Sequence, residues 1–414
     1  MKILHVTPHL GGGVGKAHAA LRGVFPSSVE QTFALLEAPR DRRHADTIAA
    51  AGAHVTVADH ARVADLAAAA DVVQFEFWNH PRLFECLARA PFPAMRSVFW
   101  SHISGLAGPV IQPGLIAAAG RFVFTTEASL GMTCVAKLSQ AERARLAVIN
   151  SGFGFAGAPG RTPRRDGPPV IAYLGTVDFI KMHPGFFDVV DRLDGPDVRV
   201  SVWGDVDPAV AAHARAMRHP ERIEFRGHTA DPAAALAAAD IFFYPLTPDH
   251  YGTAENALVE AMSLGLVPVV MNNPAETAIV RHGETGFVAN SIDECADLLR
   301  MLLTSPDLRA KVAGKAIRHV GETRTQQCSA RQFIELWTGL LPEPKRPSSF
   351  GAIVGRGPAD WFIATQCLPG ETWRPALQAH PEGRSKGGLA HFVDTYPGDA
   401  ALSRLAGVQC EAPR

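Results

Sequence analysis

A glycine-rich stretch near the start of the chain, GGGVGKAHAAL at residues 11–21, is the first pattern that could bind a ligand. It follows a short apolar run, so we expect a strand, a glycine loop and a helix, with backbone N–H groups open to an anion or a sugar. An ATP-binding P-loop would need glycine at position 10 and a hydroxyl residue after the lysine, where the chain has Leu10 and Ala17. A dinucleotide-binding fingerprint would need an acidic residue that contacts the ribose, and this chain has none at a convincing position. A tight turn without a ligand is the alternative.

The strands and helices that would hold this loop are predicted to alternate regularly along the chain. Short β-rich apolar runs alternate with helical runs from residue 2 to about residue 341, which predicts parallel sheets built from βαβ units. The expected strands are KILHVT, QTFALL, HVTV, DVVQF, RSVFW, RFVFT and AVIN, and then VIAYLG, VRVSVWG, RIEFRG, IFFYP and LVPVVM. We therefore predict an α/β protein of two Rossmann-like domains, residues 1–155 and 170–330, facing each other across a ligand-binding cleft.

Two segments interrupt this alternation of strands and helices. Residues 156–169 are rich in glycine, proline and arginine, which is typical of a linker. After residue 341 the Pro/Ser-rich stretch PEPKRPSSFG ends the alternation. We expect residues 331–414 to form a C-terminal helix and an appended segment that packs back on the N-terminal domain.

Composition narrows the class of protein. The chain has 414 residues, 47% hydrophobic and 20% charged, with a formal net charge of −1, so nothing favours a nucleic-acid partner. Its 6 cysteines form no CxxC pair, which argues against a zinc site or a disulfide framework and favours the cytoplasm. No apolar run approaches the roughly 20 residues that span a bilayer, and the start shows no signal-peptide pattern.

The most specific pattern lies in residues 240–289. A strand ending in Pro245 precedes a loop, the series N-x-L-x-E-A-M-x-x-G from Asn256 to Gly265, the run VPVV and the segment RHGETGFVA. This region resembles the donor-binding core of retaining glycosyltransferases of family 4, which have the GT-B architecture. AYLGTVDFIK, IEFRGH and AVINSGFG resemble further segments of the family, so the resemblance covers roughly residues 1–340.

The resemblance implies a nucleoside-diphosphate sugar as donor, with no metal and no cofactor. Negative charge grows on the leaving diphosphate, and Lys181 together with helix-start amides would stabilise it. Glu260 would accept hydrogen bonds from the ribose. The implied donor-binding residues are Gly11, Gly12, Gly13, Gly175, Thr176, Lys181, Gly227, His228, Glu255, Asn256, Ala257, Leu258 and Glu260. A surface lysine and a solvated helical glutamate are the alternatives for Lys181 and Glu260.

Two positions depart from the family pattern. The usual pair E-x7-E would place its first glutamate at position 252, where this chain has Gly252, and the nearest candidate is Glu255. The family often has an arginine after the strand glycine, and here Thr176 follows Gly175. We expect Glu255 to take the role of the missing glutamate, and an inactive relative that keeps the fold is the alternative.

The predicted acceptor side lies in the first domain. His102, in VFWSHISG, resembles the active-site histidine of the family, so we expect His102, Lys181 and Glu255 to be the catalytic residues. A core histidine is the alternative for His102. Glu76, Trp78, Asn79 and His80 end another strand with flat and polar groups suited to gripping an acceptor sugar, although Asn79 could instead cap the next helix.

Asp205 and Asp207 form the sequence pattern DxD, which binds a metal in a different glycosyltransferase fold. Here the pattern lies in a strand-to-helix turn, and Asp207 before Pro208 reads as an N-cap followed by proline at the first helical position. We therefore predict no metal site.

Together these patterns predict a retaining hexosyltransferase that moves a sugar to a glycan or lipid-linked acceptor. A catalytically silent protein that binds a sugar nucleotide or glycan, and a sugar-nucleotide epimerase, are the rival hypotheses. The sequence leaves open the donor base and sugar, the acceptor and linkage, the oligomeric state, peripheral membrane contact and the role of residues 342–414.

Overall fold

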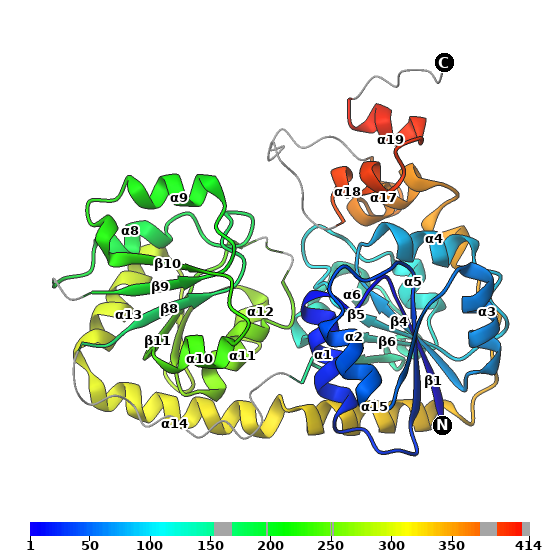
Figure 1. Ribbon diagram of the computed structural model, residues 1–414, viewed down its shortest axis with the longest axis horizontal. Coiled ribbons are helices and arrows are strands. Elements are labelled where there is room, and N and C mark those ends of the chain that lie inside the picture. Colours follow the sequence, from blue (N-terminus) through cyan, green and yellow to red (C-terminus); the bar gives the residue numbers. More distant parts are fainter. Residues whose placement is uncertain (153–167, 196–197, 249, 251, 373–386, 408–414) are drawn as a thin grey trace. The chain divides into compact units, whose positions relative to one another are not determined.

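The computed structural model describes residues 1–152, 168–195, 198–248, 250, 252–372 and 387–407. The chain divides into two compact units, one formed by Met1–Ile149 with Ala330–Arg414 and the other by Asn150–Ser329. Each unit has its own sheet (Figure 1). The predicted linker, residues 156–169, lies almost wholly outside the described residues.

The first unit contains a 7-stranded sheet in which all paired strands are parallel. In spatial order its strands are β3 (His54–Val57), β2 (Glu30–Leu35), β1 (Lys2–Thr7), β4 (Val72–Phe77), β5 (Ser97–Ser101), β6 (Arg121–Phe124) and β7 (Leu146–Val148). Every residue of β4 is buried, as expected for a strand covered on both faces. Because parallel strands end at one edge of a sheet, the residues after β1, β2, β4 and β5 gather there.

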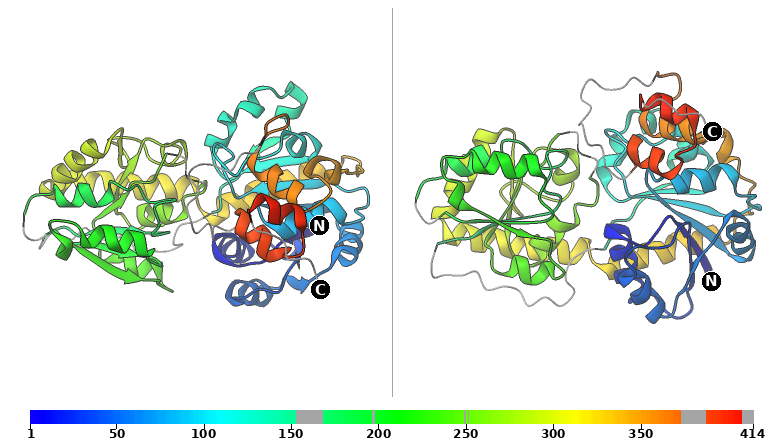
Figure 2. Two further views of the ribbon diagram at one scale, coloured as in Figure 1. Left: turned by 90° about the horizontal axis from the view of Figure 1, so that it is seen from above. Right: turned by 45° about the horizontal axis from the view of Figure 1, so that its top comes forward.

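Helices cover both faces of this sheet (Figure 2). They are α1 (Gly12–Arg22), α2 (Arg43–Ala50), α3 (His60–Ala69), α4 (Pro81–Arg89), α5 (Pro113–Ala118), α6 (Thr133–Ala136) and α7 (Gln140–Arg143), with a 3₁₀ turn at Glu127–Gly131. Phe75 and Phe99 of the sheet pack in one apolar cluster with Leu83 of α4. Phe33 packs in a second cluster with Ile48 of α2.

The C-terminal residues are helical and belong mainly to the first unit. They form α15 (Gln326–Leu340), α16 (Phe350–Val354), α17 (Pro358–Gln366), α18 (Leu389–Thr395) and α19 (Ala400–Leu405). The helices α16, α17 and α18 pack against α4. Phe350, Trp361 and Phe392 of these helices are buried in the apolar cluster of the first unit.

The second unit contains a 6-stranded parallel sheet. Its strands, in spatial order, are β10 (Ile223–Gly227), β9 (Val200–Trp203), β8 (Ile171–Leu174), β11 (Ile241–Tyr244), β12 (Val267–Met271) and β13 (Phe287–Ala289). Its helices are α8 (Phe186–Asp191), α9 (Pro208–Arg215), α10 (Pro232–Ala237), α11 (Asn256–Ser263), α12 (Pro274–Thr277), α13 (Ile292–Thr304) and α14 (Pro306–Thr323), with a 3₁₀ turn at Pro220–Arg222.

The prediction of two Rossmann-like α/β sheets is confirmed, and each predicted strand is present. The structure adds β13, which the sequence analysis did not predict. Asp207 caps α9, because its side chain accepts a 2.8 Å hydrogen bond from the Ala209 amide. Among the described helices, none is long and apolar enough to cross a membrane.

Candidate active site

An ion pair marks the polar centre of the second unit. Lys181 follows β8, and its Nζ lies 3.1 Å from Oε2 of Glu255, which immediately precedes α11. The Tyr244 hydroxyl, at the end of β11, donates to the same oxygen over 2.9 Å. The structure thus brings together two predicted catalytic residues that are 74 positions apart.

Glu255 holds an unusual backbone conformation. Among the described residues it is the one non-glycine residue with a positive φ, at 37°. Such a conformation costs on the order of 1–3 kcal/mol and is typical of functional sites. Burial raises the pKa of Glu255, but the positive charge of Lys181, with smaller contributions from His250 and Tyr244, outweighs burial and holds the pKa below its usual value. Glu255 is therefore an ionised carboxylate, held by a cation.

Gly252, where the family pattern has a glutamate, is directly related to Glu255. A Cβ atom at position 252 would overlap Oε1 of Glu255 and also crowd the His250 ring. The absence of a side chain at 252 therefore makes room for the carboxylate of Glu255. The glycine at position 252 and the glutamate at position 255 therefore form a single structural arrangement.

His250 and Glu276 extend this polar centre inward. His250 Nε2 lies 2.9 Å from Glu276 Oε1, and His250 Nδ1 accepts a 3.0 Å hydrogen bond from the Gly252 amide. Burial raises the pKa of Glu276, the opposite direction to the pKa of Glu255. The sequence analysis missed both residues, and the signal for them was weak because each lies in a loop or a short helix.

The other predicted donor residues of the second unit are spread along the carboxyl edge of its sheet. Asn256, Ala257 and Leu258 begin α11, and Glu260 lies buried one turn later. Gly175 and Thr176 follow β8, next to Lys181 in the chain. Gly227 ends β10 and His228 follows it, two strands away from β8 in the sheet.

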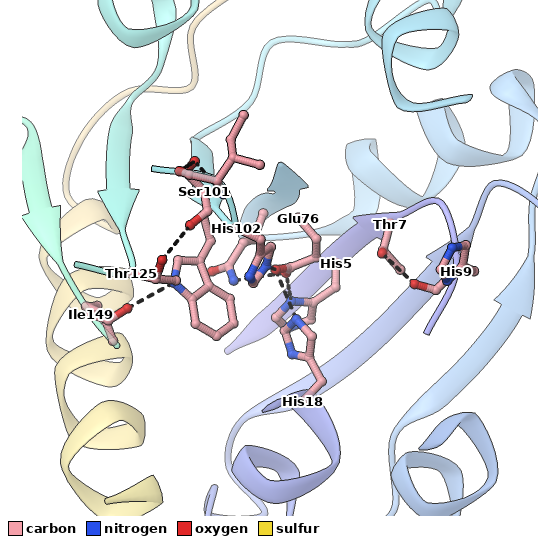
Figure 3. A network of polar contacts seen from close by, with 12 residues as sticks. His5, Thr7, His9, His18, Glu76, Ser101, His102, Thr125 and Ile149 are labelled. Carbon is pink, nitrogen blue, oxygen red and sulfur yellow. Dashed lines mark hydrogen bonds and ion pairs between the residues drawn. The ribbon is translucent and has the colours of Figure 1, made fainter. Parts of the chain in front are cut away.

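The first unit has a polar centre around Glu76, in the buried strand β4 (Figure 3). His5 Nδ1 lies 2.9 Å from Glu76 Oε1, and His102 Nε2 lies 3.0 Å from Oε2. His18 Nε2, from α1, also lies 3.0 Å from Oε2. Gln74 donates to Oε1 over 3.0 Å, so the carboxylate is surrounded by N–H donors.

These contacts fix the protonation of His5 and His102. Burial lowers the pKa of His5 to about 4 and also lowers the pKa of His102, so both rings are neutral near pH 7. The electrostatic interaction with His18 and the hydrogen bonds of the surrounding imidazoles outweigh the burial of Glu76 and hold its pKa well below the usual value. Neutral His102 donates from Nε2 to Glu76, which leaves Nδ1 as the nitrogen that can accept a hydrogen bond.

The structure corrects two expectations for the first unit and excludes one alternative. Glu76 is 0% exposed and bound by imidazoles, so it positions His102 and is not placed to grip an acceptor. His80, not Asn79, caps α4, because its Nδ1 accepts from the Arg82 amide. The glycines do not form a free loop, since α1 already begins at Gly12.

Gly11 and Gly15 also have local structural roles. The Gly11 amide donates to Nδ1 of His9 over 3.0 Å. A Cβ at Gly15 would overlap the Leu10 carbonyl oxygen, so this glycine permits close packing at the start of α1. Gly11, Gly12 and Gly13 belong to the first unit, whereas Lys181 and Glu255 belong to the second.

The sequence analysis missed His5 and His18. The available signal was the presence of His5, Gln74 and Glu76 in strands that are otherwise apolar on both faces. Buried polar groups of this kind need partners. The partners themselves could not be read from the sequence, because β1, β4 and β5 become neighbours only in the folded sheet.

Two parallel Rossmann-like sheets define the GT-B architecture, and solved structures of glycosyltransferases share it. A glycosyltransferase from Rickettsia africae ESF-5 superimposes with a TM-score of 0.67 and 13% identity, covering 83% of this chain and 99% of the other. Anabaena HepE in complex with UDP-glucose superimposes with a TM-score of 0.65 and 17% identity, covering 82% of this chain and 100% of the other. At these sequence identities the structural similarity shows a shared fold only.

The sequence match is more specific for the second unit. Residues 168–305 match the family Glycosyl transferases group 1. GDP-Man:Man(3)GlcNAc(2)-PP-Dol alpha-1,2-mannosyltransferase from Dictyostelium discoideum is 28% identical over 113 residues, 27% of this chain and 21% of the relative. The match spans about one fifth of the length of the curated relatives, at 20% and 21%.

Proposed function

We propose that the protein transfers a sugar from a nucleoside-diphosphate sugar to a hydroxyl group of a glycan or lipid-linked acceptor. The observation that carries the proposal is the ion pair between the partly exposed Lys181 and the buried Glu255 at the start of α11, inside the matched region. As the anomeric C–O bond breaks, negative charge grows on the diphosphate. Lys181 provides a point charge for it, and the N-terminus of α11 provides the positive end of a helix dipole.

Glu255 and His102 have complementary roles in this proposal. Glu255, kept ionised by Lys181, accepts hydrogen bonds from donor hydroxyl groups in place of a glutamate at position 252. Neutral His102 presents Nδ1 to a sugar hydroxyl close to the reacting carbon, because its Nε2–H is bound to Glu76. Both groups therefore act as hydrogen-bond acceptors near pH 7.

We further propose transfer with retention, in which the acceptor hydroxyl attacks from the side of the leaving group. The departing phosphate takes the proton of that hydroxyl, so the proton and the leaving group stay on one face of the sugar. Lys181 and the helix start supply the positive charge in this scheme, and Asp207 is engaged in capping α9. Transfer is therefore expected without a divalent metal.

The described cysteines support a location inside the cell. Cys86, Cys134, Cys295, Cys328 and Cys367 are unpaired thiols. Proteins of oxidising compartments tend to pair their cysteines. We therefore propose that the protein works in the cytoplasm.

The test begins with a thermal-shift screen of UDP, GDP, ADP and dTDP sugars. A donor at ~100 times its dissociation constant stabilises the native state by about 2.7 kcal/mol. Release of nucleoside diphosphate is then measured with acceptors, with and without EDTA. The Lys181→Ala variant should lower turnover by about 10²–10³, the cost of losing one group that stabilises transition-state charge.

Lys311→Ala, on the exposed face of α14, is the matched control and should retain turnover. The product's anomeric proton, observed by NMR, reports retention or inversion. Donor binding without turnover for any acceptor would favour the silent binding protein. Unchanged turnover in Lys181→Ala would remove Lys181 from the site, and complete loss with EDTA would contradict metal independence.

A further inference from the structure

The short helix α12 of the second unit carries a buried carboxyl group that the proposed reaction does not use. Glu276 is 0% exposed, and its Oε1 lies 2.9 Å from Nε2 of His250. Among the described residues, neither Glu276 oxygen has a hydrogen bond of acceptable geometry, and Oε1 of Glu255 also lacks one. Ring nitrogen or carboxyl oxygen atoms of these three residues lie within 4.8 Å of one another. Buried polar groups of this kind need an explanation.

A histidine and two glutamates at this spacing suggest a metal site at first sight, but the contacts of both residue types oppose it. His250 Nδ1 accepts a hydrogen bond from the Gly252 amide over 3.0 Å. A neutral ring whose Nδ1 accepts carries its proton on Nε2, so the nitrogen that faces Glu276 has no lone pair for a metal. The ammonium of Lys181 already neutralises Glu255. The group is therefore better explained by a role inside the protein.

His250 connects Glu276 with the backbone that precedes α11. One ring nitrogen contacts Glu276 and the other accepts the Gly252 amide, so the buried ring is fixed at both ends. A Cβ atom at position 252 would overlap Oε1 of Glu255 and crowd the same ring. The position of His250 therefore determines where the Glu255 carboxylate can lie. Glu255 has a positive φ of 37°, a conformation that persists only where the surrounding structure imposes it.

The turn before α12 also holds the segment that carries Lys181. Asn273 immediately precedes α12, but its side chain does not cap that helix. The side-chain amide donates instead to the carbonyl of Leu246 over 3.2 Å and to that of Thr247 over 3.4 Å. The Thr247 amide in turn donates to the Lys181 carbonyl over 2.9 Å. Glu276 lies one turn after Asn273, so the same short segment supports both members of the ion pair.

We propose that Glu276 is a positioning residue of the candidate active site, which acts through His250 to hold Glu255 in its left-handed conformation beside Lys181. The inference rests on the proposed transferase function, because it assigns Glu276 to the same reaction. Glu276 itself does not touch the donor. It keeps the Glu255 carboxylate arranged for the donor hydroxyls and the Lys181 ammonium arranged for the diphosphate before the donor binds.

The surroundings of Glu276 favour an uncharged carboxyl group. Burial and the negative charge of Glu255 raise the pKa of Glu276, and the hydrogen bond and charge of His250 oppose them only in part. The other polar groups of the centre, Lys181 and Tyr244, are engaged with Oε2 of Glu255. An uncharged acid still accepts from the His250 Nε2–H through its carbonyl oxygen. Glutamine offers the same shape and the same acceptor, so it should replace Glu276, whereas methionine should not.

The first experiment compares Glu276→Gln and Glu276→Met in the full-length protein, with UDP-, GDP-, ADP- and dTDP-glucose as donors. Glu276→Met keeps a long buried side chain but has no oxygen acceptor for His250. Its kcat for nucleoside-diphosphate release should fall about tenfold or more with a smaller change in KM, because the Lys181 ammonium acts on charge that grows in the transition state. Glu276→Gln should stay within about twofold of the wild type. Glu284→Met, at an exposed position of the same unit, is the matched control and should leave both constants unchanged.

The second experiment needs no donor. In protein labelled with ¹⁵N-lysine, the side-chain ammonium signal of Lys181, identified by its loss in Lys181→Ala, reports the contact with Glu255. The signal should move in Glu276→Met and remain in place in Glu276→Gln. It should also move in His250→Asn, because asparagine keeps a polar atom near the position of Nδ1 but is too short to reach Glu276. If Glu276→Met does not fold by circular dichroism, His250→Asn decides the outcome.

An unchanged Lys181 signal and unchanged turnover in the folded variants would overturn the positioning role. A Glu276→Gln variant as impaired as Glu276→Met would also overturn it, because the charge of the group and not its shape would then matter. A Lys181 signal that moves as expected, in a protein that neither binds nor turns over any donor, would keep the positioning role and reject the transferase proposal. Wild-type turnover that Glu276→Met and His250→Asn leave unaffected would reject the positioning role alone.

Discussion

Glu76 in the first unit and Glu255 in the second are both buried carboxylates near the ends of parallel strands, yet they are neutralised by different partners. Glu76 lies inside β4 and receives N–H groups from Gln74 and from imidazoles, of which His5 and His102 are neutral. Glu255 precedes α11 and receives the ammonium of Lys181 and the hydroxyl of Tyr244. Both carboxyl groups have a pKa below the usual value.

In the proposed function, Glu76 positions the side chain of His102, whereas Glu255 contacts the donor directly. The partners of Glu76 are almost fully buried, and its contact with His102 determines which ring nitrogen can accept a hydrogen bond. Lys181 is 14% exposed, so its ammonium can reach a diphosphate while Glu255 remains beside it. We therefore expect changes at Glu76 to act mainly on folding and geometry, and changes around Glu255 mainly on donor use.

The largest expected effect is the loss of stability in Glu76→Ala. It leaves several buried donors without an acceptor, each at a cost of about 1–3 kcal/mol, so the first unit should lose roughly 3–5 kcal/mol. Glu255→Ala should lose less, about 1–2 kcal/mol, because the partly exposed Lys181 can be hydrated. Hydrogen exchange of peptides from each unit measures the two losses separately, which matters because a two-unit chain need not unfold in one step.

Glu30→Ala, at the exposed start of β2, is the control and should change stability by less than about 0.5 kcal/mol. Equal losses in Glu76→Ala and Glu255→Ala would contradict the separation of roles. So would a destabilisation by Glu76→Ala that appears only in peptides of the second unit.

Sequence reasoning predicted the sheets well because buried parallel strands leave continuous apolar runs. KILHVT and HVTV match β1 and β3 at both ends. The strand β13 was not predicted because Phe287–Ala289 is only 3 residues long and directly follows a glycine-rich turn.

The site was predicted in part, and the limits have a physical cause. Lys181 was identified by its place in a family segment and Glu255 as the glutamate nearest to position 252, and the structure places their side chains in contact. The overlap of a side chain at 252 with Glu255, and the fourfold contact around Glu76, depend on three-dimensional packing. The alternative role of Asn79 as the cap of α4 is excluded because His80, one residue later, accepts the cap hydrogen bond.

The second prediction concerns acid sensitivity and centres on His5. The pKa of His5 is about 4 in the folded protein and about 6.5 when unfolded, so between these values the unfolded chain binds a proton that the folded chain does not. Stability of the first unit should therefore fall as the pH drops from about 6.5 to about 4, by up to roughly 3 kcal/mol. In the second unit the lowered pKa of Glu255 and the raised pKa of Glu276 act in opposite directions.

Unfolding of each unit, followed by hydrogen exchange across this pH range, tests that difference. His5→Asn should flatten the profile of the first unit, while His54→Asn, at an exposed position of β3, should leave it unchanged. A second unit that loses as much stability as the first between these pH values would contradict the contrast. A first unit whose stability rises on acidification would show that His5 is protonated in the folded state.

The smallest expected effect separates the two donors that Glu255 receives. Tyr244→Phe removes one hydroxyl from Oε2 but leaves Lys181 in place, so it should cost roughly 1.5 kcal/mol and let the pKa of Glu255 rise while the group stays ionised near pH 7. Tyr173→Phe is the matched control, because the Tyr173 hydroxyl donates to the Thr176 carbonyl. Donor binding measured against pH should shift its acid limb upward in Tyr244→Phe and not in Tyr173→Phe. If Tyr244→Phe lowered turnover as much as Lys181→Ala, the hydroxyl and not the cation would hold Glu255, and the difference between the two carboxylates would disappear.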